Sequence, residues 1–235
     1  MSSYNILAEY YDELIIDPDG VRQWADFTEA HLTKEGRVLE LASGSGAISE
    51  ALMERGYDLT LSDLSEEMLK RAKEKFPDKD DIYVLDMREL NLKDKYDGIL
   101  CYNDSINYLT EEEEIKACFK GVYEALKQGG TFLFDAHTTE RLEEFREEYV
   151  EEGEIKDAQY QWSILSEEDY LTHHLTFWIK DETYMEEHVQ RIYPLSFLKD
   201  CLKEAGFTVC VYTDFIEKET VPGEKWYFVA RKQEG

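Results

Sequence analysis

Basic residues are scarce in this chain. Its 235 residues include 26 Lys+Arg against 53 Asp+Glu, which gives a formal net charge of −27. Such a surface repels phosphate backbones, and no stripe rich in lysine and arginine offsets the repulsion. The charge therefore disfavours nucleic-acid substrates, and most of the acidic excess is explained as a contribution to solubility.

Cysteine is also sparse, and long apolar runs are missing. The four cysteines form no CxxC pair and no zinc spacing, so we expect buried, reduced thiols and a reducing cytoplasm. No apolar run approaches the length of a membrane span, and the first residues lack the basic and apolar regions of a signal peptide. His173 and His174 are adjacent, so on a strand they point to opposite faces and cannot share a metal ion. We expect a cytoplasmic protein without a metal site or membrane contact.

The composition is that of a globular protein, with 43% hydrophobic and 13% aromatic residues. The length fits one domain over residues 1–235, with no internal repeats. Two helices are predicted over residues 5–34, with a break near 17–20. Strands and helices then alternate to about residue 136, which predicts a parallel sheet with helices on both faces. We place the end of the helix before the fifth strand at Gly129-Gly130.

A glycine-rich turn follows the first predicted strand. The apolar run 38–41 breaks into small residues at 42–47, and an amphipathic helix continues from there. Glycine lets a ligand approach the backbone, and the unpaired N–H groups of a helix start face that ligand. The string Gly44-x-Gly46 followed by Ser49 is an incomplete dinucleotide fingerprint, so the turn alone indicates only nucleotide binding.

Polar residues end the next three strands. Asp63 ends the second strand, 17 residues after Gly46, where an acidic residue commonly binds ribose hydroxyls. Asp86 and Met87 follow the third strand, and Asn103-Asp104-Ser105 follows the fourth. Ligands of open α/β sheets bind at this carboxyl edge, so a site is predicted there.

Four segments in register resemble the class I S-adenosylmethionine-dependent methyltransferases over residues 36–136. They are ELASGSG (40–46), LSDLSEEML (61–69), VLDMREL (84–90) and YDGILCYNDSINYL (96–109). The resemblance implies an α/β, Rossmann-like, seven-stranded and mostly parallel sheet in the order 3-2-1-4-5-7-6, with a small antiparallel insertion after strand 5. It also implies S-adenosylmethionine as the cofactor. The segment 102–108 resembles the small-molecule branch, which includes amino-sugar and glycine N-methyltransferases.

The resemblance implies a set of cofactor contacts. Asp63 would hold the ribose, although it could instead cap the following helix, and Asp86 with Met87 would clamp the adenine. Glu40 would orient the turn or meet the ammonium group of the cofactor. Ala42 stands where the family has its first glycine, and Ser43 and Ser45 would add hydroxyl contacts. The full set of predicted cofactor residues is Tyr11, Glu40, Ala42, Ser43, Gly44, Gly46, Asp63, Leu64, Met68, Asp86, Met87 and Asn103.

Methyl transfer is an in-line displacement, so orientation supplies most of the catalysis and a base serves only to remove a proton. Asn103 and Asp104 would face the methyl group, and the Asp104 carboxylate could orient the nitrogen of an acceptor. His137 and His188 are the candidate bases, each with a structural alternative, and Tyr108 could line the site.

Residues 155–193 alternate aromatic and β-branched positions, which predicts a three-stranded antiparallel insertion acting as a lid or a homodimer interface. The resemblance also implies that residues 1–34 form a helical cap in which Tyr4, Tyr10 and Tyr11 close over the cofactor, although Tyr10 could equally be a core aromatic. We expect methyl transfer to a small molecule, an amine or a hydroxyl. The alternatives are a non-catalytic cofactor-binding protein and a nicotinamide-dependent oxidoreductase, which Ser49 disfavours because that fingerprint requires glycine or alanine there.

Overall fold

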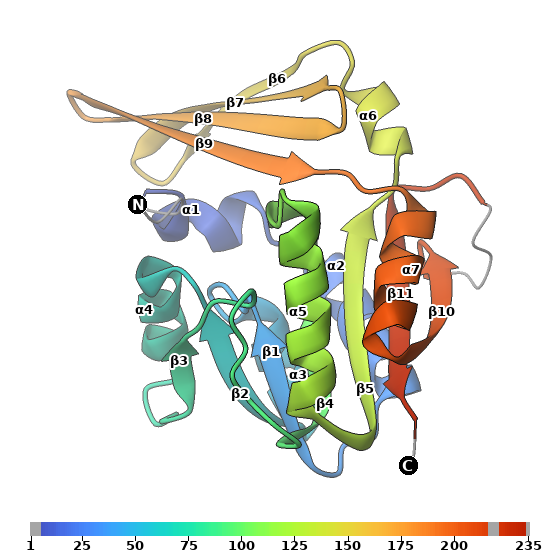
Figure 1. Ribbon diagram of the computed structural model, residues 1–235. Coiled ribbons are helices and arrows are strands. Elements are labelled where there is room, and N and C mark those ends of the chain that lie inside the picture. The colour runs from blue at the N-terminus through green and yellow to red at the C-terminus, as the bar shows by residue number, and fades with distance from the viewer. Residues whose placement is uncertain (1–5, 216–220, 234–235) are drawn as a thin grey trace.

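The computed structural model describes residues 6–215 and 221–233, and a seven-stranded sheet forms its centre (Figure 1). The sheet order is β10-β11-β5-β4-β1-β2-β3, which confirms the predicted order, and β11 runs antiparallel to the other six strands. The strands are β1 (Arg37–Leu41), β2 (Asp58–Asp63), β3 (Ile82–Val84), β4 (Tyr96–Cys101), β5 (Leu126–His137), β10 (Phe207–Thr213) and β11 (Lys225–Lys232).

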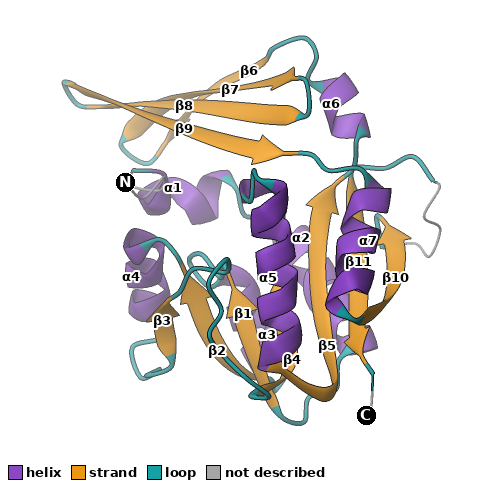
Figure 2. Ribbon diagram, in the orientation of Figure 1, coloured by secondary structure: helices purple, strands orange, loops and turns teal. Residues whose placement is uncertain are grey.

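Helices cover both faces of this sheet, as predicted (Figure 2). One face packs α5 (Glu112–Ala125) and α7 (Leu195–Ala205), with Phe119, Phe132 and Phe134 in the core between them and the strands. The other face packs α2 (Pro18–His31), α3 (Ala47–Glu54) and α4 (Glu66–Lys75). Burial on both faces explains the apolar runs of β4 and β5, whereas the central strand β2 alternates apolar residues with the small buried polar residues Thr60 and Ser62.

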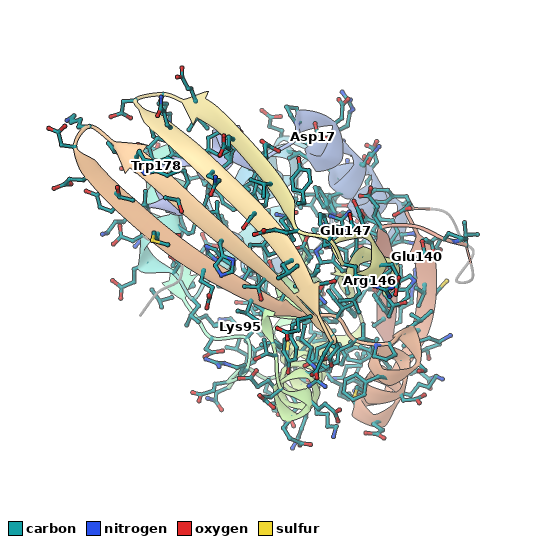
Figure 3. The ribbon with its side chains drawn as sticks, turned by 90° about the horizontal axis from the view of Figure 1, so that it is seen from above. Asp17, Lys95, Glu140, Arg146, Glu147 and Trp178 are labelled. Carbon is teal, nitrogen blue, oxygen red and sulfur yellow. The ribbon has the colours of Figure 1, made fainter. Side chains whose placement is uncertain are left out.

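A second sheet of four antiparallel strands lies above the carboxyl edge of the first (Figures 1 and 3). Its strands are β6 (Tyr149–Ile155), β7 (Ala158–Glu167), β8 (Tyr170–Ile179) and β9 (Glu182–Arg191), and α6 (Glu140–Glu144) precedes them. The predicted three strands were one too few. The missed strand, β6, is an edge strand with the sequence YVEEGEI, whose exposed acidic residues give no alternating apolar pattern.

The α1 helix (Leu7–Leu14) lies between the two sheets (Figure 1). Its buried Leu7 and Tyr10 pack against Leu175 and Phe177 of β8. Tyr10 stacks on Phe177 with ring centroids 5.2 Å apart, so the structure places it in the core, the alternative that the sequence left open. Tyr4 lies outside the described residues.

Two predicted helix boundaries differ in the structure. The α2 helix begins at Pro18 because Asp17 caps it, its side chain accepting hydrogen bonds from the N–H groups of Asp19 and Gly20. The prediction that α5 ends at Gly129-Gly130 was wrong, since the helix ends at Ala125 and β5 already pairs with β4 at Leu126. Among the described residues, no helix combines the length and the apolar character that crossing a bilayer requires.

Candidate functional site

The glycine-rich turn after β1 has a left-handed backbone. Gly44 and Gly46 have φ values of +56° and +81°, and a Cβ on Gly46 would lie 2.6 Å from the Phe76 ring. Ala42 also has a positive φ, +50°, which is disfavoured for a residue with a side chain. The bond from Ser43 N–H to the carbonyl of Ser62, 2.8 Å long, ties the turn to β2 and helps to maintain this conformation.

Asp63 joins this turn to the start of α4. One carboxylate oxygen accepts from Gly44 N–H at 2.9 Å and the other from Ser65 N–H at 2.8 Å. Burial raises the pKa of Asp63, and the backbone bonds offset only part of that shift. Ser65 caps α4, because its hydroxyl accepts from Met68 N–H at 3.3 Å, so the alternative that Asp63 is the helix cap is wrong.

A first cavity of about 230 Å³ opens beside this turn. Its lining includes the acidic ends of β2 and β3 and a set of apolar side chains. The predicted cofactor residues that line it are Tyr11, Ala42, Gly44, Asp63, Leu64, Met68, Asp86 and Met87. Arg88 pairs with Asp86 through contacts of 2.6–3.0 Å, and this pairing lowers the pKa of Asp86.

Glu40 lies behind the turn in a small cavity that Ser43 and Asn103 also line. Its carboxyl accepts from the Ser49 hydroxyl at 2.6 Å, and burial raises its pKa to about 7. The folded protein therefore holds a proton that the unfolded chain releases above pH 4.5. The stability contributed by this proton is complete below about pH 4.5 and is lost as the pH rises through about 7.

A second cavity, of about 220 Å³, lies between the ends of β4 and β5 and the inner face of the four-stranded sheet. It contains all five predicted catalytic residues: Asn103, Asp104, Tyr108, His137 and His188. Tyr11, Ser105 and Tyr108 line both the first and the second cavity, so the two cavities share a boundary. The Asn103 amide donates to the Tyr11 hydroxyl at 2.9 Å at this boundary.

A buried charge cluster forms the floor of the second cavity. Lys225 Nζ lies 2.5 Å from Asp104 Oδ1 and 3.1 Å from Asp135 Oδ2. Burial would lower the pKa of Lys225, but the two carboxylates more than offset burial and raise it. Burial raises the pKa of Asp135, whereas Lys225 and His137 hold that of Asp104 well below its usual range despite burial.

Asp104 therefore already has partners, which alters the role predicted for it. Its Oδ2 accepts from Gln190 Nε2 at 2.6 Å and lies 3.4 Å from His137 Nε2, while Lys225 occupies Oδ1. Both Asn103 and Asp104 have positive φ values, +56° and +50°, so the chain makes a tight left-handed turn here. The prediction that Asp104 orients an acceptor nitrogen gains no support, because its charge is balanced within the protein.

Sequence reasoning missed several residues in and around the second cavity. Asp135, which contacts Lys225 but does not line the cavity, had a detectable signal, since it interrupts the apolar run TFLFDAH. Trp162 and His173, which line the cavity, belonged to the predicted insertion. Lys225 and Gln190 had none, because each stands at or next to the end of a strand far along the chain. Gly46 was predicted as a cofactor residue but lines neither cavity within the described part of the chain.

Comparison with known proteins identifies the family. The family described as "Methyltransferase domain" matches residues 38–130. YqeM of Bacillus subtilis, which carries a provisional methyltransferase name, is 34% identical over 240 residues and covers 97% of each chain. A glycine/sarcosine N-methyltransferase of Aphanothece halophytica is 26% identical over 222 residues, 89% of this chain and 81% of that protein.

Solved structures agree. An S-adenosylmethionine-dependent methyltransferase from Clostridium acetobutylicum superposes with a TM-score of 0.82 at 28% identity, over 100% of both chains. The motif order, the sheet order and these relatives confirm the resemblance that the four sequence segments indicated. The chain belongs to the class I S-adenosylmethionine-dependent methyltransferases and takes its methyl group from S-adenosylmethionine.

Proposed function

We propose that the enzyme methylates the nitrogen of a small amine that binds in the second cavity, while S-adenosylmethionine binds in the first. One observation carries the proposal. The two cavities meet at Tyr11, Ser105 and Tyr108, so a group held in one faces a group held in the other. Bringing two reactants together in this way is the main requirement of a displacement at carbon.

The residues of the first cavity fit the cofactor. Each ionised carboxylate has about four acceptor positions, so Asp63 keeps positions for two ribose hydroxyls beyond its two backbone bonds. Leu64, Met68 and Met87 provide apolar surface for a ring, whereas Arg88 already occupies both oxygens of Asp86. The Ser43 hydroxyl is buried without a partner among the described residues and would bind the amino-acid tail.

Glu40 suits the ammonium group of that tail. It is buried, its only polar side-chain bond among the described residues is to Ser49, and its raised pKa shows the cost of ionising it without a nearby cation. S-adenosylmethionine, when bound, supplies a methyl group activated by its sulfonium, and the protein's residues position the acceptor and remove a proton.

Two imidazoles are placed to take that proton. His137 Nε2 lies 3.4 Å from the Asp104 carboxylate, which favours the tautomer with its proton on Nε2 and a lone pair on Nδ1. His188 lines the same cavity, and its Nε2 lies 3.3 Å from the Glu186 carboxylate. Asp104 acts through His137 as a positioning residue, since its lowered pKa makes it a poor base itself.

The relatives support nitrogen as the atom methylated. The relative from Aphanothece halophytica is named for glycine and sarcosine, which are amines. A Streptomyces venezuelae relative, 28% identical over 111 residues and 47% of this chain, is named as an N,N-dimethyltransferase of an amino sugar nucleotide.

A screen of small amines and alcohols, scored by release of S-adenosylhomocysteine, tests the proposal. We expect release with at least one amine, and loss of most of it in either His137→Asn or His188→Asn while S-adenosylhomocysteine still binds. The pH profile of kcat/KM shows which histidine is the base. When the base itself is replaced, kcat/KM should no longer fall at low pH, whereas replacing the other histidine should leave that fall in place. Release with alcohols alone would refute nitrogen as the acceptor atom.

We also propose that nucleic acids are not substrates. The net charge of −27 repels a polyanion, and the four-stranded sheet covers the second cavity (Figure 3). We expect no labelling of bulk tRNA, rRNA or DNA from labelled cofactor at physiological salt. Labelling of undermodified RNA that is lost in Asn103→Ala would reverse this conclusion.

A further inference from the structure

Polar atoms of the four-stranded sheet line the second cavity without close protein partners. His173 Nε2 on β8 and Gln190 Oε1 on β9 are buried in the cavity wall, where the two side chains interact with each other but neither atom forms a close hydrogen bond with any described residue. In the β8–β9 register, His173 pairs with His188 and Leu171 pairs with Gln190. His173 and Gln190 are therefore diagonal neighbours on one face of the sheet, close enough for one ligand atom to contact both.

The protein itself fixes His173 Nε2 as a donor. Trp162 Nε1 donates to His173 Nδ1 at 3.2 Å, and an indole nitrogen can only donate. His173 Nδ1 must therefore accept. Burial lowers the pKa of His173 to about 4, so the ring is neutral at pH 7. Its single proton is on Nε2, which presents an N–H to the cavity.

The protein likewise fixes Gln190 Oε1 as an acceptor. The other end of this amide, Nε2, donates to Asp104 Oδ2 at 2.6 Å, and an ionised carboxylate can only accept. The amide cannot be reversed without losing that bond. Gln190 is 2% exposed, so bulk water does not reach its oxygen freely.

The charged side chains that line this part of the cavity are paired within the protein. Lys225 pairs with Asp104 and also with Asp135, and Arg141 pairs with Glu144 at 2.5 Å. A neutral ligand group suits this part of the cavity better than a charged one. A hydroxyl is the group that accepts one hydrogen bond and donates another through a single atom.

We propose that the methyl acceptor carries a hydroxyl group that accepts from His173 Nε2 and donates to Gln190 Oε1. This inference rests on the proposed function, because it describes a second group of the same amine. It makes His173 a residue that determines specificity and Trp162 a positioning residue that fixes its tautomer. The volume of about 220 Å³ equals that of about seven water molecules, enough for an acceptor with one ring.

Matched amine pairs test the proposal on the full-length enzyme. The pairs are 2-aminocyclohexanol with cyclohexylamine, 2-aminoethanol with ethylamine, and glucosamine with cyclohexylamine. Binding is measured by calorimetry on protein saturated with S-adenosylhomocysteine, and turnover by S-adenosylhomocysteine release. We expect at least one hydroxyl-bearing amine to bind at least tenfold more tightly than its partner.

The variants His173→Phe and Trp162→Phe should reduce that preference to less than threefold and leave binding of the amine without a hydroxyl within threefold of the native value. His174→Phe is the matched control, because His174 lies next on β8 with its side chain exposed and paired with Glu187. It should keep the full preference.

The outcomes separate the two proposals. Three results would each overturn the hydroxyl proposal. They are equal binding within every pair, no binding by any hydroxyl-bearing amine, and a preference for the hydroxyl that survives His173→Phe. Hydroxyl-dependent binding without turnover of any amine in the wider screen would instead count against the proposed amine methylation.

Discussion

Replacing Lys225 by methionine is the sharpest test of the buried charge cluster. Methionine keeps most of the length of the side chain and removes its charge. Asp104 and Asp135 then face each other without a cation, although their side chains are only 17% and 0% exposed. The Trp24 ring, which lies 5.1 Å from Lys225 Nζ, can pack against the methionine just as well.

The expected loss follows from desolvation. Removing one partner of a buried ion pair costs about 3–5 kcal/mol, because the remaining charge has no compensation. A chain of this size loses roughly 2–4 °C of Tm for each kcal/mol, so Lys225→Met should lower Tm by about 6–20 °C. Without Lys225, the pKa of both carboxyls should rise above that in the unfolded chain. The deficit should therefore grow with rising pH and shrink as the pH falls toward about 4.

Thermal and urea unfolding between pH 4 and 8 measure the effect. Lys127→Met is the matched control, since Lys127 pairs with Asp97 at 2.8 Å but is 44% exposed, and such pairs contribute at most about 1 kcal/mol. Adding Asp135→Asn to Lys225→Met should recover part of the loss, because one uncompensated charge is removed. A loss below 1 kcal/mol that does not vary with pH would refute the reasoning.

Three further predictions concern the cofactor and the cap. Glu40 has a pKa of about 7, so at pH 6.5 roughly three-quarters of the molecules carry a proton on this carboxyl. The ammonium group of S-adenosylhomocysteine should displace that proton on binding, and calorimetry in two buffers measures the release. Glu40→Gln should release none. Asp63→Ala leaves two backbone N–H groups unpaired, so it should cost about 2–4 kcal/mol of stability and lower cofactor affinity at least tenfold. Asp58→Ala, at the exposed start of β2, is the control and should change neither quantity. Glu186 accepts the first N–H groups of α1, so Glu186→Gln should speed hydrogen exchange in α1. Equal exchange in Glu186→Gln and the exposed control Glu187→Gln would show that this contact does not anchor α1.

The first sheet could be predicted from the sequence because its signals are local. Polar residues stand at or just after the carboxyl ends of several strands, and Asp63 and Asp86 mark two of these positions. Since parallel strands share one carboxyl edge, residues far apart in the chain could be assigned to one site. The first cavity followed from this rule, and eight of the predicted cofactor residues line it.

The second cavity could be predicted only in part, since its walls come from elements whose register is not visible in the sequence. His137 and His188 could be proposed as isolated histidines, but the partners that define their tautomers could not. Lys225 meets Asp104 only because β11 runs antiparallel beside β5, which brings the first residue of β11 opposite His137 at the end of β5. The missed β6 shows the same limit. This acidic edge strand is defined by its pairing with β7, which its own sequence pattern does not reveal.

The charge balance in the second cavity bears on how the enzyme distinguishes acceptors. A carboxylate without a counter-ion would attract any cationic amine, and the surrounding acidic surface would strengthen that attraction. Under the proposed function, Lys225 pairs with Asp104 beside the bound acceptor, so selection passes to neutral hydrogen bonds from the four-stranded sheet. Such bonds discriminate strongly because a buried donor or acceptor left without its partner costs more than a lost apolar contact. Since Gln190 binds Asp104 with one end of its amide and faces the cavity with the other, the charge cluster and the recognition atoms are one connected network. A change to Lys225 should therefore alter acceptor selectivity as well as stability.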